Sequence, residues 1–81
     1  MLDIRVAHVA ADGTRTSVDV QVVPRTTVWG VLMQARSQGL AFDLDASDVV
    51  VGSETITTFE TTRFVRSGTV EIRARRTLLD A

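Results

Sequence analysis

The chain contains neither cysteine nor lysine, and it has a single proline and a single histidine among its 81 residues. The absence of cysteine excludes disulfides, a thiolate nucleophile and a zinc–sulfur site. All nine basic residues are arginine, and ten acidic residues leave a formal net charge of −1. This balance argues against a broadly basic, nucleic-acid-binding protein.

Long apolar runs are missing as well. No stretch approaches the length of a membrane span, and the first residues, Met1 to Arg5, lack the apolar core of a secretion signal. We therefore expect a cytoplasmic protein with no membrane partner. Because the length suits one hydrophobic core, a single domain over residues 1–81 is expected.

The first half of the chain predicts a hairpin followed by one helix. Apolar and polar residues alternate over residues 2–9 and 18–22, which is typical of half-buried strands, and Asp12-Gly13 suits the tight turn between them. Pro24 ends the second strand because it lacks an N–H for the ladder. Thr27 is the predicted N-cap and Gly39 the predicted stop. The expected buried face of the helix comprises Val28, Val31, Leu32 and Ala35.

The second half predicts short strands and no further long helix. They are expected at residues 49–51 and 55–57 and after Gly68, with Val70, Ile72 and Ala74 facing inward on the last strand. Residues 58–66 show no regular pattern. Three apolar side chains in this region are expected to fill the core, namely Phe59, Phe64 and Val65.

The order strand–strand–helix–strand–strand predicts an α+β fold of the β-grasp type, a mixed sheet of four to five strands packed on one helix. The chain resembles the ubiquitin superfamily in Val22-Val23-Pro24 with Thr26-Thr27-Val28, in residues 49–56 and in residues 68–73. It is most similar to the bacterial RnfH-like proteins, whose Val-Glu-Ile strand and leucine-containing acidic tail match Val70-Glu71-Ile72 and Leu78-Leu79-Asp80. The aromatic, arginine and proline that continue the strand in that family are replaced here by Arg73-Ala74-Arg75.

The resemblance implies a carrier, a tag or a binding module rather than an enzyme. Modifiers and sulfur carriers of the superfamily act through a C-terminal Gly-Gly, whereas the last glycine of this sequence is Gly68. A carrier is therefore the less favoured alternative. The primary expectation is a non-catalytic interaction module or regulatory adaptor that binds another protein and needs no cofactor.

Enzymatic chemistry has few candidate residues in this sequence. His8 is the single histidine, and no nucleophile, base and oxyanion arrangement can be assembled around it. Asp43, Asp45, Ser47 and Glu54 match the first, third, fifth and twelfth positions of a calcium loop, but the sixth is Asp48 instead of glycine. A solvated acidic loop is the preferred interpretation, and no metal site is predicted.

The arginines are concentrated toward the C-terminal part of the chain. Arg73 and Arg75 are expected on the outer face of the last strand, with Arg5 facing the same way on a neighbouring strand. Such a stripe would suit an acidic protein surface or an RNA backbone. A solvated face paired with Asp3 and Glu71 is an equally supported alternative. Because aromatic residues for base stacking are missing from the sheet, RNA binding is the weaker functional alternative.

Two further surfaces are candidates for partner binding. Val50 faces outward on the short third strand beside Arg73, so an apolar patch of the ubiquitin kind is only half present. Trp29 and Met33 lie on one flank of the helix, and exposed tryptophan beside methionine is typical of contact surfaces. The alternative, which we slightly favour, is that residues 40–42 fold back and cover both side chains.

Overall fold

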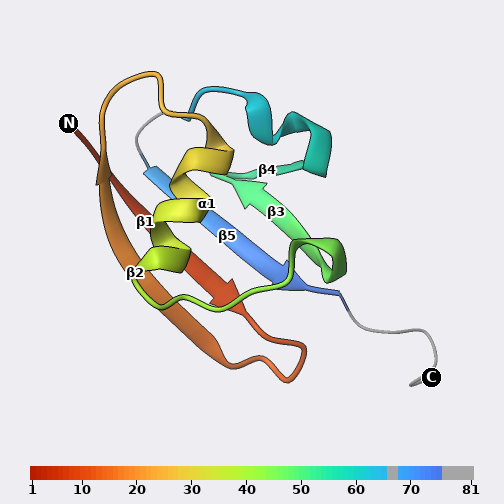
Figure 1. The fold of residues 1–81 in the computed structure, drawn as a ribbon. Coiled ribbons are helices and arrows are strands. Elements are labelled where there is room, and N and C mark those ends of the chain that lie inside the picture. Colours follow the sequence, from red (N-terminus) through yellow and green to blue (C-terminus); the bar gives the residue numbers. More distant parts are fainter. Residues whose placement is uncertain (66–67, 76–81) are drawn as a thin grey trace.

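The computed structural model describes residues 1–65 and 68–75. One helix packs on one face of a five-stranded mixed sheet, which confirms the α+β class (Figure 1). The elements in chain order are β1 (Leu2–Val9), β2 (Arg15–Val22), α1 (Val28–Ser37), the 3-10 helix η1 (Leu44–Ala46), β3 (Ser47–Val51), β4 (Glu54–Ile56), the 3-10 helix η2 (Thr58–Thr62) and β5 (Gly68–Ala74).

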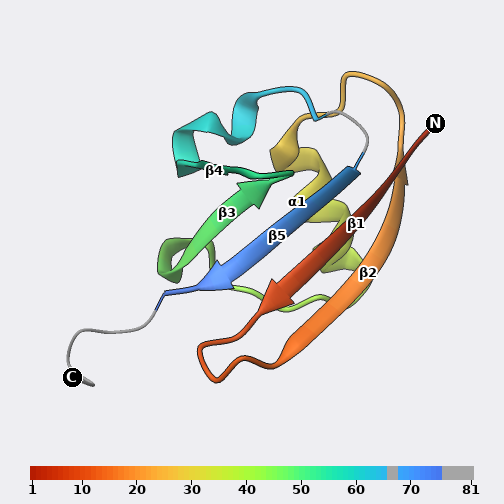
Figure 2. The same ribbon diagram turned by 180° about the vertical axis from the view of Figure 1, so that it is seen from behind.

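The strand order is β2-β1-β5-β3-β4. The first and last strands, β1 and β5, are neighbours and run parallel, whereas every other pair in the sheet is antiparallel. Figure 2 shows the face of the sheet opposite α1, which is not covered by any helix of the described residues. The sheet therefore has one face in the core and one outer face.

The core lies between α1 and the inner face of the sheet. The predicted helix face and the predicted inward positions Val70 and Ile72 of β5 are confirmed, whereas Ala74 is only partly buried. Leu40 completes the core after the helix. Both the helix and the sheet contribute fully buried side chains to this core. The largest fully buried side chains are Ile4, Leu32, Leu40 and Ile72.

The predicted ends of α1 are also confirmed. The side chain of Thr27 accepts a hydrogen bond from the Gly30 N–H at 3.1 Å, as an N-cap should. Gly39 follows the last turn with a φ of +102°, a conformation that glycine adopts without steric cost. No helix in the described part of the chain has both the length and the apolar character needed to cross a membrane.

The prediction for residues 58–66 was partly wrong. Val65 is buried as expected, but Phe64 is 64% exposed. The reason is that residues 63–65 run extended beside the start of the helix, with the Val28 N–H donating to the Arg63 carbonyl at 2.9 Å. Neighbouring residues in an extended segment point to opposite sides, so only one of Phe64 and Val65 can enter the core. The predicted core position of Phe59 lies outside the described side chains.

Candidate functional site

The outer face of the sheet holds the predicted arginines but does not align them into a stripe. Arg5 on β1 lies opposite Thr69 of β5, whereas Arg73 lies opposite Val9. Arg5 and Arg73 are therefore offset by four residues along the strand direction, which corresponds to about 13 Å. The predicted stripe was wrong because the register of the parallel pair sets the two guanidinium groups apart.

Each of these arginines already has partners. Arg5 donates from Nε to Asp19 at 3.0 Å, which raises the pKa of its guanidinium, mainly through that hydrogen bond. Arg75 forms an ion pair with Asp48 at 3.5 Å and donates to the carbonyl of Asp45 at 2.8 Å. Asp3, predicted as a partner of the arginines, instead accepts a hydrogen bond from Gln21 at 2.9 Å. Much of the charge on the outer face is thus neutralised within the protein.

Glu71 is the centre of the remaining pairs. It lies in the middle strand and accepts hydrogen bonds from Arg73 and, at 3.2 Å, from Arg15. The predicted pairing with Glu71 is therefore confirmed for Arg73. The hydrogen bond from Arg73 is the main cause that lowers the pKa of Glu71, and the charges of both arginines act in the same direction against partial burial.

This pairing predicts a pH dependence of stability. Because the pKa of Glu71 is lower in the folded protein than the usual 4.5 of an unfolded chain, its ionised form stabilises the fold above that pH. The contribution is lost as the pH falls through the folded pKa. We expect Glu71→Gln to cost about 1 kcal/mol near neutral pH and progressively less below about pH 4.5. Urea unfolding of both proteins across this range measures the difference, and an equal difference at every pH would contradict the assignment.

Val50 has a different neighbour from the one predicted. The residue directly opposite Val50 on β5 is Glu71. Arg73 lies two residues further along β5, opposite Asp48. Val50 is only partly exposed, beside a carboxylate held by two arginines. An apolar recognition patch is therefore not assembled around it.

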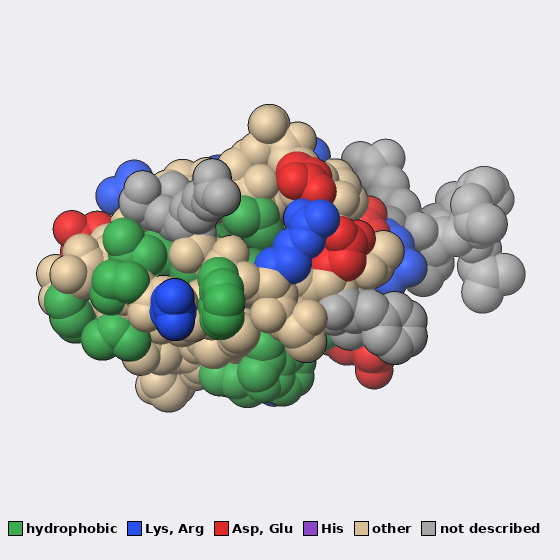
Figure 3. Space-filling model, turned by 90° about the horizontal axis from the view of Figure 1, so that it is seen from above, with side chains coloured by type: hydrophobic (Ala, Val, Ile, Leu, Met, Phe, Trp, Pro, Cys, Tyr) green, Lys and Arg blue, Asp and Glu red, His purple; other side chains and the backbone are tan. Residues whose placement is uncertain are grey.

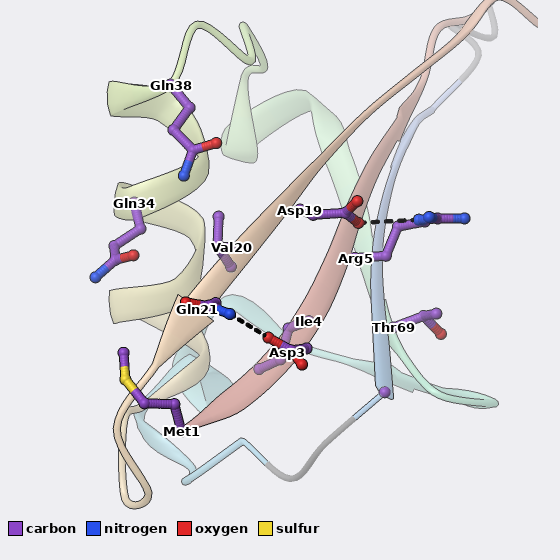
Figure 4. Close-up of a pocket in the computed structure, with 11 residues that line it drawn as sticks. Met1, Asp3, Ile4, Arg5, Asp19, Val20, Gln21, Gln34, Gln38 and Thr69 are labelled. Atoms are coloured by element: carbon purple, nitrogen blue, oxygen red, sulfur yellow. Dashed lines mark hydrogen bonds and ion pairs between the residues drawn. The ribbon is translucent and has the colours of Figure 1, made fainter.

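A shallow depression borders β2. Figure 4 shows Arg5 reaching to Asp19 and Gln21 reaching to Asp3, with Gln34 and Gln38 on the helix. Its charged side chains are thus already hydrogen-bonded, Arg5 to Asp19 and Asp3 to the amide of Gln21. They leave few unsatisfied groups for a ligand.

The flank of α1 that carries Trp29 and Met33 is only partly covered. Leu40 enters the core, and Phe42 is held by Arg36, whose guanidinium lies 4.5 Å from the ring centre. Met33 is half-buried, but Trp29 remains 46% exposed. The interpretation that residues 40–42 cover both side chains was therefore wrong for Trp29. A groove remains between this flank and η1, lined by Trp29, Met33, Arg36, Asp43, Leu44 and Asp45.

Four large hydrophobic side chains are exposed toward the end of the molecule where β1 begins, β2 ends and α1 starts. Among the described residues they are Met1 (75% exposed), Val23 (62%), Phe64 (64%) and Trp29 (46%), here called the apolar end. Leu2 pairs with Val22, so Met1 and Val23 extend beyond the same end of the hairpin. Phe64 bridges to Thr27, the cap of the helix whose first turn holds Trp29. Figure 3 looks onto this end and shows hydrophobic side chains spread over it.

A hollow of about 460 Å³ opens beside Phe64. Val28, Val51 and Ile56 form its apolar walls. Its edge carries the ion pair of Arg63 with Glu54 at 2.9 Å, and Glu60 holds the same guanidinium at 3.0 Å. These two carboxylates raise the pKa of Arg63, chiefly through the hydrogen bond that Arg63 donates to Glu54. The apolar end thus combines exposed side chains with a concave, mostly apolar surface.

The residues at calcium-loop spacing have separate roles in the structure. Asp43 caps η1 by accepting from the Asp45 N–H at 3.1 Å, and Ser47 donates its hydroxyl to the Asp43 carbonyl. Glu54 pairs with Arg63 in the hollow described above. His8 is half-buried in β1, between Thr16 of β2 and Ile72 of β5.

Sequence reasoning identified Trp29 but missed the other members of the apolar end. The available signal was the adjacent pairs Val22-Val23 and Phe64-Val65. In an extended chain, two consecutive apolar residues face opposite sides, so one of each pair must point away from a one-sided core. No protein-family model matches this chain, and no curated protein matches it significantly.

Proposed function

We propose that this protein is a non-catalytic, ubiquitin-like β-grasp module that binds another protein and acts as an adaptor. The hairpin, the helix across it and the return of the chain into a mixed sheet with parallel β1 and β5 support the β-grasp assignment. The resemblance to RnfH-like proteins is part of the same proposal. Of its motifs, Val70-Glu71-Ile72 lies in β5, and Leu78-Leu79-Asp80 lies outside the described residues.

The observation that carries the proposed function is the apolar end. Exposed hydrophobic side chains are ordinary when they are scattered singly, but a gathered patch is typical of a contact surface. Tryptophan, phenylalanine and methionine are also among the residues enriched at the centres of protein interfaces. Here Met1, Trp29 and Phe64 share one end with Val23, and a hollow adjoins Phe64.

The outer face of the sheet is the secondary candidate. Arg5, Arg73 and Arg75 are exposed, but a partner would have to compete with the carboxylates they already contact. Exposed ion pairs contribute little to stability and exchange readily, so rim contacts at this face are compatible with the proposal. Val50 would add only a small apolar area to them.

The test removes the apolar character of this end without touching the core. We expect the double variant Val23→Ser/Phe64→Ser to keep the fold, because both side chains are mostly exposed, with an unfolding free energy within about 1 kcal/mol of the original. A protein that co-purifies with the tagged original from its native host should be reduced at least about tenfold with this variant. Quantitative mass spectrometry of the purified complexes measures the change.

The matched control is Val50→Ser/Arg73→Gln on the outer face of the sheet, which removes one apolar and one charged side chain that do not line the hollow beside Phe64. It should retain the partner. If the partner still binds the apolar-end variant but no longer binds the control variant, the binding site lies on the outer face. A partner released by ribonuclease would favour the RNA alternative.

A further inference from the structure

The turn that leads from β2 into α1 places a strained arginine within the apolar end. The Thr26 N–H donates to the Val23 carbonyl at 3.2 Å, which closes a four-residue turn with Pro24 and Arg25 in its centre. Arg25 has a φ of +71°, and it is the one residue other than glycine with a positive φ among those described. Proline followed by a positive φ is the type II turn, whose second central position favours glycine or asparagine. A residue with a side chain at this position, such as Arg25, therefore adopts a sterically unfavourable backbone conformation.

Arg25 also differs from the other arginines in its surroundings. Within residues 1–65 and 68–75, every other arginine side chain makes a hydrogen bond or ion pair that holds its guanidinium, and Arg25 makes none. Figure 3 shows a basic side chain among the hydrophobic ones, apart from a second basic side chain that lies between acidic ones. Of the carboxylates toward this end, Glu54 and Glu60 are both held by Arg63, and Asp3, two residues from Met1, accepts a hydrogen bond from Gln21.

We propose that the apolar end binds a protein segment in which apolar side chains accompany a carboxylate, and that Arg25 pairs with this carboxylate. The proposal rests on the proposed function and specifies the partner's chemistry. Arg25 lies two residues after Val23 and two before Thr27, the residue that bridges to Phe64. A partner surface that covers Val23 and Phe64 therefore also covers the turn between them.

The physical reason for the carboxylate is desolvation. An exposed guanidinium is fully hydrated, but contact with an apolar partner would remove part of that water. A buried charge without a counter-charge opposes binding, whereas a planar carboxylate accepts two hydrogen bonds from one guanidinium. Because Arg63 engages Glu54 and Glu60, Gln21 engages Asp3, and no described carboxylate pairs with Arg25, the counter-charge would come from the partner. Arginine is also among the residues enriched at interface centres, which agrees with its position here.

The test selects binders from a library of random linear peptides displayed on phage, with the whole chain as the target. We expect the enriched peptides to combine aromatic or aliphatic residues with aspartate or glutamate. Isothermal titration of the best peptide should show at least about a tenfold weaker affinity for Arg25→Asn, which keeps the left-handed turn but removes the charge. The affinity of the original protein should also fall as salt is raised.

Two controls separate the possible outcomes. Arg15→Gln removes an exposed arginine at the opposite end of β2 and should leave the affinity unchanged, whereas Val23→Ser/Phe64→Ser should abolish binding. Peptides that need Val23 and Phe64 but bind Arg25→Asn equally well would overturn the acidic partner and leave the proposed function standing. Peptides whose affinity does not depend on Val23 and Phe64 would contradict the proposed function itself. A selection that enriches no peptide would contradict it as well.

Discussion

Replacing Ile72 with alanine is expected to lower the free energy of unfolding by about 3 kcal/mol. Ile72 is completely buried in β5, between His8 of β1 and Val49 of β3, and its side chain packs in the core beneath α1. Truncation of a buried isoleucine removes apolar contacts and leaves a cavity that the surroundings fill only in part. For a small domain with about 5–10 kcal/mol of stability, this is a large fraction of the total.

The matched control for this prediction lies on the same strand. Thr69 faces the exposed side of β5, so Thr69→Ala should change the unfolding free energy by about 0.5 kcal/mol or less. Urea denaturation followed by circular dichroism measures both variants. Similar losses for the two positions would mean that the assignment of inner and outer faces on β5 is wrong.

Leu40 and Trp29 are expected to behave in opposite ways, although both are large apolar residues near the helix. Leu40 is 2% exposed and closes the core after the helix ends, so Leu40→Ala should cost about 3 kcal/mol. Trp29 is 46% exposed, and Trp29→Ala should cost about 1 kcal/mol or less. The helix would survive the second substitution, because its buried face is formed by other residues.

The comparison of these two variants also tests the position of Trp29 in the apolar end. If Trp29→Ala unfolds the protein, the indole is part of the core and not a contact surface. If the fold is retained and a co-purifying partner is weakened, Trp29 belongs to the interface. Thermal unfolding and the partner's recovery are measured on the same preparations, so that the two effects are separated.

Much of the fold was predictable because it depends on local patterns. Alternation predicted β1, β2 and β5, and the spacing of Val28 and Leu32 predicted the buried face of α1. Thr27 marked the start of the helix because its hydroxyl can accept from the first turn, and Gly39 marked the end because glycine tolerates a positive φ. All of these signals act between residues close together in the chain, so one sequence suffices to read them.

The candidate site depended on contacts that no local pattern records. Which residues lie opposite each other on β1 and β5 follows from the register of two strands about 60 residues apart, and it separated Arg5 from Arg73. Phe64 was expected inside because it is apolar, but its pairing with Thr27 turns it outward. The segment after α1 placed Leu40 in the core and left Trp29 exposed.

The sequence by itself determined which segments form strands and helix and which of their faces are apolar, because alternation, caps and turns act over a few residues. Tertiary structure decided which surplus apolar side chains remain outside, since an extended segment with the core on one side can bury only one of two adjacent residues such as Phe64 and Val65. It also decided which charges are paired. Arg5 pairs with Asp19 on the neighbouring strand and Arg73 with Glu71 on its own strand. Arg25 projects from a strained turn at the apolar end and pairs with no carboxylate of the described residues.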